Sequence, residues 1–180
     1  MSRRILFAIG LIISAALIRV LPHPHNFAPL GAMGLFGAAY FRRSWGLLIP
    51  FIALFLSDLV LNNVVYAAYY PSFKWVSSGW SYLSFAAVFT VGFLYFQKGI
   101  SVLKVGGASL TASVVFFLVS NFSTFVETTL YPKTLAGLMT CFSAGIPFFP
   151  NTLVSDLFFS AVMFGAYEWV TQKAKLKLHF

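Results

Sequence analysis

The sequence predicts an all-α integral membrane protein, a single domain over residues 1–180 with six transmembrane helices. Of its 180 residues 59% are hydrophobic and only 9% are charged, and the mean hydropathy is +0.86. An ordinary globular chain is about 25% charged, and a soluble domain of this size needs more polar side chains to cover its surface. The composition therefore excludes a soluble globular protein, a disordered chain and a disulfide-stapled secreted module.

Apolar runs set the positions of the expected helices, since a helix needs about 17–25 such residues to cross a bilayer. We place the spans at about 5–21, 28–41, 45–65, 80–96, 105–125 and 152–170. The second run is short and rich in glycine and alanine. A further apolar piece, 135–149, is broken by Gly145 and Pro147. We expect it to form a re-entrant or interfacial segment within the last outer loop.

The basic residues predict the orientation. Twelve lysines and arginines against four acids give a net charge of +8. They lie in short clusters between apolar runs, as the positive-inside rule expects, so the lipid bilayer is the predicted partner and nucleic acid is not. With both termini in the cytoplasm, only Arg19, Lys74 and Lys133 lie outside. The inner set is then Arg3, Arg4, Arg42, Arg43, Lys98, Lys104, Lys173, Lys175 and Lys177.

Polar residues in three of the spans predict a ligand cavity open to the outer side. Ionisable residues inside a membrane span are costly and mark functional sites by default. Asp58, Asp156 and Asn121 all fall in the outer halves of their spans. At helical spacing, three polar stripes result. They are Asp58–Asn62–Tyr66, Thr152–Asp156–Ser160 and Ser113–Phe117–Asn121–Thr124.

Each stripe also has a purely structural interpretation. Asparagine, serine and threonine in membrane helices often only hydrogen-bond neighbouring helices. Asp156, near an interface, is equally a candidate for a helix-start residue. Asp58 is the strongest ligand candidate, because no basic residue in a neighbouring span is evident as its partner.

The remaining candidates are weaker. His23 and His25 alternate with prolines in the first outer loop; two histidines do not make a metal site, so we predict no metal. Cys141, the only cysteine, is typical of a small apolar filler. Gly10 and Ser14 form a small-xxx-small surface for another helix. No catalytic set or nucleotide motif is evident, so we expect neither an enzyme nor a cofactor.

Two short stretches echo each other, Leu56-Ser57-Asp58-Leu59 and Val154-Ser155-Asp156-Leu157. Four residues are too few to establish an internal repeat. Small residues at Gly31-x-x-Gly34-x-x-Gly37 do not follow a strand, so they predict close helix packing rather than a nucleotide loop.

Several runs carry a family resemblance. They are the stretch from Leu21-Pro22-His23-Pro24-His25-Asn26-Phe27 through Ala28-Pro29-Leu30-Gly31-Ala32, then Phe55-Leu56-Ser57-Asp58, Tyr131-Pro132-Lys133-Thr134-Leu135-Ala136-Gly137 and Gly145-Ile146-Pro147-Phe148-Phe149. Over nearly the whole chain the sequence resembles an uncharacterised family of small bacterial six-helix membrane proteins. More distantly, its layout and its Ala-Pro-Leu-Gly-Ala segment look like the substrate-binding (S) components of energy-coupling-factor (ECF) vitamin transporters.

The distant resemblance implies a function in the bacterial cytoplasmic membrane. It implies a cavity near the outer face for a vitamin-like small organic ligand, cobalamin being one candidate. It also implies a partner membrane subunit, docked on the first helix, and paired ATPases. The usual docking alanines are replaced here by Gly10 and Ser14. The expected ligand-binding residues are Asp58, Asp156, Asn121, Asn62, His23, His25 and Tyr66. A structural or assembly subunit of a larger complex and a small solitary carrier are the alternatives.

Overall fold

The structure is a computed structural model that describes residues 3–41 and 44–176, in which helices form and no strand does. The helices are α1 (Arg3–Ile18), α2 (Leu30–Tyr40), α3 (Ser44–Val60), α4 (Gly79–Phe96), α5 (Val102–Glu127), α6 (Leu135–Gly145) and α7 (Phe149–Leu176). One π-helical turn, η1 (Leu61–Val65), extends α3 and leads to the 3-10 turn η2 (Ala67–Tyr69). A second 3-10 turn, η3 (Ile146–Phe148), joins α6 to α7.

Four helical stretches within the described residues are long and apolar enough to cross a membrane, which indicates a multi-pass membrane protein. They are Trp45–Val65, Gly79–Phe96, Val102–Glu127 and Leu135–Gln172. The first three coincide closely with the predicted spans 45–65, 80–96 and 105–125. Arg42, Arg43 and Lys177, which the orientation argument uses, lie outside the described residues, and the N-in, C-in orientation stays a prediction.

The two N-terminal spans are shorter than predicted. The span expected at 5–21 is a helix that ends at Ile18, and the span expected at 28–41 is the 11-residue α2. At about 1.5 Å per residue α2 is roughly 16 Å long, well short of a hydrocarbon core about 30 Å thick. The six predicted crossings are therefore not established, because α2 cannot cross a bilayer by itself.

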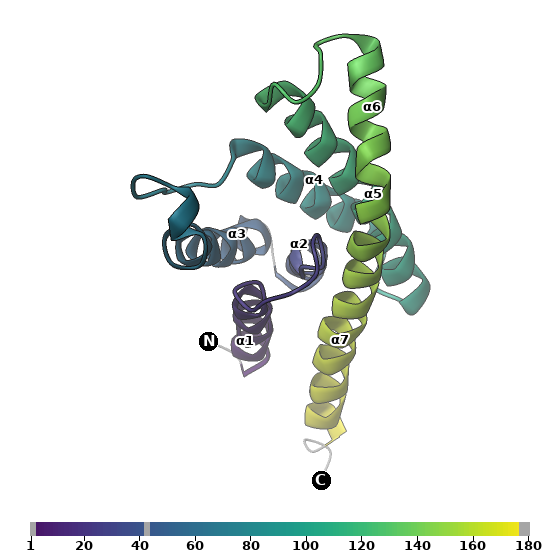
Figure 1. Ribbon diagram of the computed structural model, residues 1–180. Coiled ribbons are helices and arrows are strands. Elements are labelled where there is room, and N and C mark those ends of the chain that lie inside the picture. The colour runs from purple at the N-terminus through teal and green to yellow at the C-terminus, as the bar shows by residue number, and fades with distance from the viewer. Residues whose placement is uncertain (1–2, 42–43, 177–180) are drawn as a thin grey trace.

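The segment 135–149 is helical and not a re-entrant hairpin, while the interfacial alternative stays a prediction. It forms α6 and η3, which lead into α7 without turning back, so that Figure 1 shows α6 and α7 end to end as one rod. Pro147 lies in the first turn of η3, where its missing N–H costs no hydrogen bond. The joined stretch of 38 residues is about 57 Å long, so part of it leaves the hydrocarbon layer or the rod is steeply tilted.

Helix α2 lies at the centre of the molecule, surrounded by α1, α3, α4 and α7 (Figure 1). Three glycines spaced along it each meet a different helix: Gly31 meets α7, Gly34 meets α4 and Gly37 meets α3. A Cβ at Gly34 would lie 3.1 Å from Val88, and one at Gly37 would lie 2.6 Å from Pro50. The spacing predicted close helix packing, and the structure confirms it.

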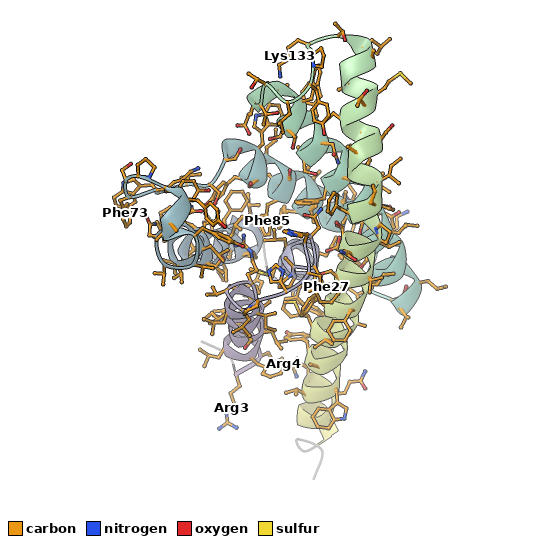
Figure 2. All side chains as sticks on the ribbon, viewed as in Figure 1. Arg3, Arg4, Phe27, Phe73, Phe85 and Lys133 are labelled. Atoms are coloured by element: carbon orange, nitrogen blue, oxygen red, sulfur yellow. The ribbon has the colours of Figure 1, made fainter. Side chains whose placement is uncertain are left out.

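The apolar core is built around α2. Its largest fully buried side chains include Phe36, Met33 and Leu35 of α2 and Ile12 of α1. Figure 2 shows Phe85 among the helices and Phe73 at the tip of the loop before α4, in agreement with exposed fractions of 3% and 59%. The apolar side chains left exposed on α3, α4, α5 and α7 are those expected to face lipid.

The close crossing of α2 and α3 yields a test of the packing. Gly37→Ala places a methyl group against the Gly46 backbone and the Pro50 ring, and such overpacking typically costs about 1–3 kcal/mol. We expect its thermal unfolding temperature in detergent to fall.

Gly165→Ala is the matched control, because a Cβ there meets nothing within 4 Å. Replacing a glycine within a helix by alanine should leave the unfolding temperature unchanged or raise it. Equal unfolding temperatures for the two variants would contradict the crossing of α2 over α3.

Candidate functional site

The segment between α1 and α2 (residues 19–29, called the α1–α2 segment) is held at its first residue by a buried ion pair. Arg19 Nη2 lies 2.9 Å from Asp58 Oδ1, with 11% of the arginine side chain and 2% of the aspartate side chain exposed. Arg19 Nη1 donates to the hydroxyl of Ser57, and the Tyr82 hydroxyl donates to Asp58 Oδ2 at 3.1 Å. Ser57 and Asp58 of α3 together fix the guanidinium group.

This ion pair corrects the expectation that Asp58 has no basic partner. Arg19 lies directly after α1 and 39 residues before Asp58, so nothing in the sequence spacing couples them. The sequence argument placed Arg19 at the outer end of the first span, 5–21, and counted it among the residues on the outer side. In the structure α1 packs on α3, which brings the guanidinium group to the carboxylate.

Asp156 holds the other end of the same segment. Its carboxylate accepts a hydrogen bond from the Ser113 hydroxyl at 2.7 Å and one from the backbone N–H of Gly31. Pro29, which precedes α2, makes no capping side-chain bond. Because the first N–H groups of a helix lack internal partners, the carboxylate caps α2 from outside.

The neighbouring serine completes this attachment. Ser155 Oγ donates to the backbone oxygen of Ala28 at 2.8 Å. The echo between Ser57-Asp58 and Ser155-Asp156 thus corresponds to two similar attachments, one at each end of the α1–α2 segment. The sequence made Asp156 a candidate cap for the start of its own helix. In the structure it instead caps the start of α2.

Three cavities lie in a row along the α1–α2 segment. The Arg19 cavity, of about 230 Å³, adjoins the Asp156 cavity, of about 150 Å³, through the shared residues His23 and Ala28. The Asp156 cavity adjoins the Asn121 cavity, of about 270 Å³, through the shared residues Asn26, Phe116 and Thr152. Each of the three predicted stripes therefore contributes some of its residues to this row of cavities, from η1, α5 and α7.

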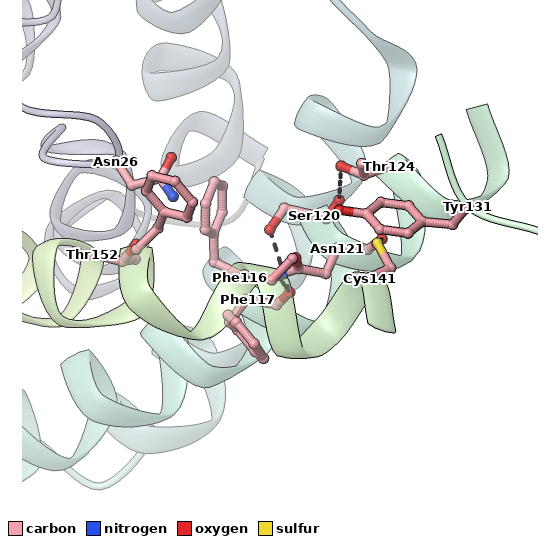
Figure 3. Close-up of a pocket in the computed structure, with 12 residues that line it drawn as sticks. Asn26, Phe116, Phe117, Ser120, Asn121, Thr124, Tyr131, Cys141 and Thr152 are labelled. Carbon is pink, nitrogen blue, oxygen red and sulfur yellow. Dashed lines mark hydrogen bonds between the residues drawn. The ribbon is translucent and has the colours of Figure 1, made fainter. Parts of the chain in front are cut away.

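The Asn121 cavity is shown in Figure 3, with Asn26, Phe116 and Thr152 at one end and Tyr131 and Cys141 at the other. Asn121 Nδ2 donates to the Phe117 backbone oxygen at 2.8 Å, so part of its amide serves its own helix. Cys141 is buried and its Sγ lies 3.3 Å from the Asn121 backbone oxygen.

The structure distributes the predicted ligand-binding residues unequally. Those that line the cavities are His23, Asn62, Tyr66, Asp156 and Asn121. Asp58 is hydrogen-bonded to Arg19 and lines none of the three cavities. His25 lines none of them either. Its ring packs edge-on against Phe148, and its backbone oxygen accepts a hydrogen bond from Asn151. The roles of all seven in binding stay predictions.

Sequence reasoning missed several lining residues. Arg19 carried a usable signal, since it is the only basic residue between 5 and 21. Asn26 has a left-handed backbone (φ +61°), a conformation for which asparagine is favoured among non-glycine residues. Phe116 has no such signal, because an apolar residue in an apolar helix does not stand out.

His23 is held within the α1–α2 segment itself. Its Nδ1 lies 3.0 Å from the Pro24 backbone oxygen and its Nε2 lies 3.2 Å from the Arg19 backbone oxygen. Both ring nitrogens thus lie beside backbone oxygens, and the nitrogen that carries the N–H donates to one of them. No group of three potential metal ligands occurs among the residues that the structure describes.

Gly10 and Ser14, the predicted docking pair, lie on the exposed face of α1. A Cβ at Gly10 would meet nothing within 4 Å. The buried face of the helix carries Ala8, Ile12 and Ala15 instead. The pair is therefore accessible to a second helix.

The ion pair predicts an asymmetry between single and double variants. Asp58→Asn leaves the Arg19 charge buried without its counter-ion, and breaking such a pair typically costs about 3–5 kcal/mol. We expect a large fall in the thermal unfolding temperature in detergent.

The double variant Arg19→Met with Asp58→Leu removes both charges and should unfold at a higher temperature than Asp58→Asn alone. A single variant as stable as the unmodified protein would show that the pair does not form.

The comparisons with known proteins add a family. No curated protein and no solved structure matches the chain significantly. One family model, described as a family of unknown function (DUF6580), matches residues 1–178. The match spans nearly the whole chain, as the first resemblance predicted. The chain belongs to this family of unknown function.

Proposed function

We propose that the protein is the substrate-capturing membrane component of an uptake transporter, similar to the S components of ECF transporters. In this proposal a vitamin-like small organic molecule binds along the α1–α2 segment from the outer side of a bacterial cytoplasmic membrane. The observation that carries the proposal is the row of three cavities, to which η1, α5 and α7 each contribute polar side chains.

The chemistry of the cavities supports capture of an organic molecule. Ligand sites are mostly apolar hollows with a few convergent polar groups, and here Phe116 and Phe117 lie beside Asn121, Thr152 and Asp156. The individual volumes, about 150 to 270 Å³, lie below the 300–1,000 Å³ typical of ligand pockets. A compound of one or two rings that occupies adjoining cavities is therefore better supported than cobalamin.

The α1–α2 segment suits the role of an outer cover. It is attached through Arg19 at one end and through Ala28 and Gly31 at the other, and between them His23 and Asn26 are exposed. A partner membrane subunit, energised by paired ATPases, would dock on the exposed face of α1 at Gly10 and Ser14. Leu6, Ile13 and Leu17, each at least half exposed, extend this face.

An assembly subunit is the alternative that one observation favours. A groove of about 680 Å³ lies between α5 and α7, away from the row of cavities, and Gly106 and Gly165 leave its walls open. Such a groove suits a helix of another subunit. This alternative predicts co-purification with a fixed set of membrane proteins and no retained small molecule.

A solitary carrier has less support. It would use Asp58 and Asp156 as exchangeable proton or ion sites, whereas the two carboxylates are bonded to Arg19 and Tyr82 and to Ser113 and Gly31. It predicts transport in liposomes without an ATPase.

Filling the cavity row tests the capture role. Ala28 lines both the Arg19 cavity and the Asp156 cavity, and it attaches to α7 through its backbone oxygen only. Ala28→Phe therefore adds a ring where the ligand is expected, so that retention should fall by about tenfold or more. Mass spectrometry of small molecules released from gently purified protein measures this retention.

Ala161→Phe is the matched control, because Ala161 lines the groove between α5 and α7 instead. It should retain the ligand at the unmodified level. An unmodified protein that is empty but brings fixed membrane partners would favour the assembly subunit. Equal retention by the two phenylalanine variants would contradict binding along the α1–α2 segment.

A further inference from the structure

We propose that the Arg19 cavity binds a carboxylate group of the captured molecule, so that the substrate is a small organic anion. This inference rests on the proposed capture function and adds the chemical class and the orientation of the ligand. The polar lining of the cavity includes Arg19, His23, Asn62, Tyr66, Tyr70 and Ser77. None of the residues that line it is acidic.

Asn62, which lines the cavity, has a side-chain donor without a hydrogen-bond acceptor. The residue is 3% exposed, and its Oδ1 accepts a hydrogen bond from the Ser77 hydroxyl at 2.9 Å. Its Nδ2 has no partner, the one such buried side-chain atom among the described residues. Buried polar groups are almost always paired, and an unpaired donor is costly. A ligand oxygen that accepts from Nδ2 supplies the missing partner.

The backbone around Asn62 is also unusual. Asn62 and Asn63 lie in the π-helical turn η1, a rare conformation that occurs frequently at functional sites. Asn63 makes two hydrogen bonds to the backbone of Lys74, through Nδ2 at 2.9 Å and Oδ1 at 2.8 Å. The turn thus leaves Asn62 facing the cavity while its neighbour anchors the loop that follows.

One cation, Arg19, lines this cavity, and a second, Lys74, lies beside one of its lining residues. The hydrogen bonds of Arg19 to Ser57 and Asp58 use two of the five N–H donors of a guanidinium group. Lys74 does not line the cavity, but its Nζ lies 4.1 Å from the centre of the ring of Tyr70, which does. Since Asp58 balances only one of these charges, the cavity favours an anion.

The adjoining Asp156 cavity sets the orientation. Its lining contains the buried carboxylate of Asp156 together with Phe116 and Leu30. A ligand carboxylate finds no lysine or arginine there, and the Asp156 carboxyl group already accepts hydrogen bonds from Ser113 and Gly31. The acid group therefore lies toward Arg19 and Asn62, and the neutral body of the ligand lies toward Phe116.

The test begins by identifying a ligand in an unbiased binding screen. Purified full-length protein in detergent is incubated with a bacterial metabolite extract and re-isolated, and the bound compounds are identified by mass spectrometry. The expected result is a compound with a carboxylate. Its primary amide, which has the same shape without the charge, should bind about tenfold more weakly or worse.

Asn62→Asp locates the carboxylate. The variant keeps the oxygen that accepts from Ser77 but replaces the free donor by a negative charge. We expect it to bind the compound about tenfold more weakly or worse. Gln97→Glu, the same change of charge at an exposed position after α4, should bind at the unmodified level. Asn62→Leu, which removes the unpaired donor without adding a charge, should also bind more weakly and shows whether the position tolerates substitution.

The outcomes separate this inference from the proposed function. A neutral or cationic bound compound, or one that Asn62→Asp binds as tightly as the unmodified protein, overturns the anion assignment and leaves capture standing. A protein that binds nothing from the extract overturns the capture function and the anion assignment with it. Folding of each variant is checked by gel filtration and thermal unfolding.

Discussion

The structure depends on one constraint, that a short helix buried among apolar helices must have its end groups satisfied by protein. Residues 31–37 of α2 are buried, and the N-terminal N–H groups of the helix have no partner within it. Asp156 supplies the missing acceptor from α7. Glycines on three sides of α2 let its neighbours approach. The buried carboxylate is thus explained by the helix that it caps, and the position of α2 places α3, α4 and α7 around it.

The segment that leads into α2 is also held by polar groups of other helices. The α1–α2 segment is attached at one end through Arg19 to Ser57 and Asp58, and at the other through Ala28 and Gly31 to Ser155 and Asp156. Each attachment pairs a serine with the aspartate that follows it. Between the two attachments the segment bridges α3 and α7, and the three cavities lie along it. The aspartates are therefore supports of the site, and the free polar atom is found elsewhere, on Asn62.

This division of roles changes which residues would define the proposed ligand. A carboxylate that is already bonded within the protein has less to offer a ligand than an unpaired donor beside a cation. In the proposal, Arg19, Asn62 and the neighbouring Lys74 would favour an anionic group of the ligand, whereas the lining around Phe116 would favour its uncharged body. The exposed face of α1 and the groove between α5 and α7 are two further surfaces. Neither includes a residue that lines the row of cavities.

The sequence by itself determined the class of protein, the positions of three spans and the residues worth examining. Hydropathy is a local property, so 45–65, 80–96 and 105–125 were predicted closely. Tertiary structure alone decided the rest. The ion pair of Arg19 with Asp58, the capping of α2 by Asp156 and the merging of 135–149 into α7 each join or align groups that no local pattern relates. The sequence shows that a polar residue falls within an apolar run, where it is costly in a membrane. Only the packing of the helices shows whether a neighbour in the protein already satisfies it.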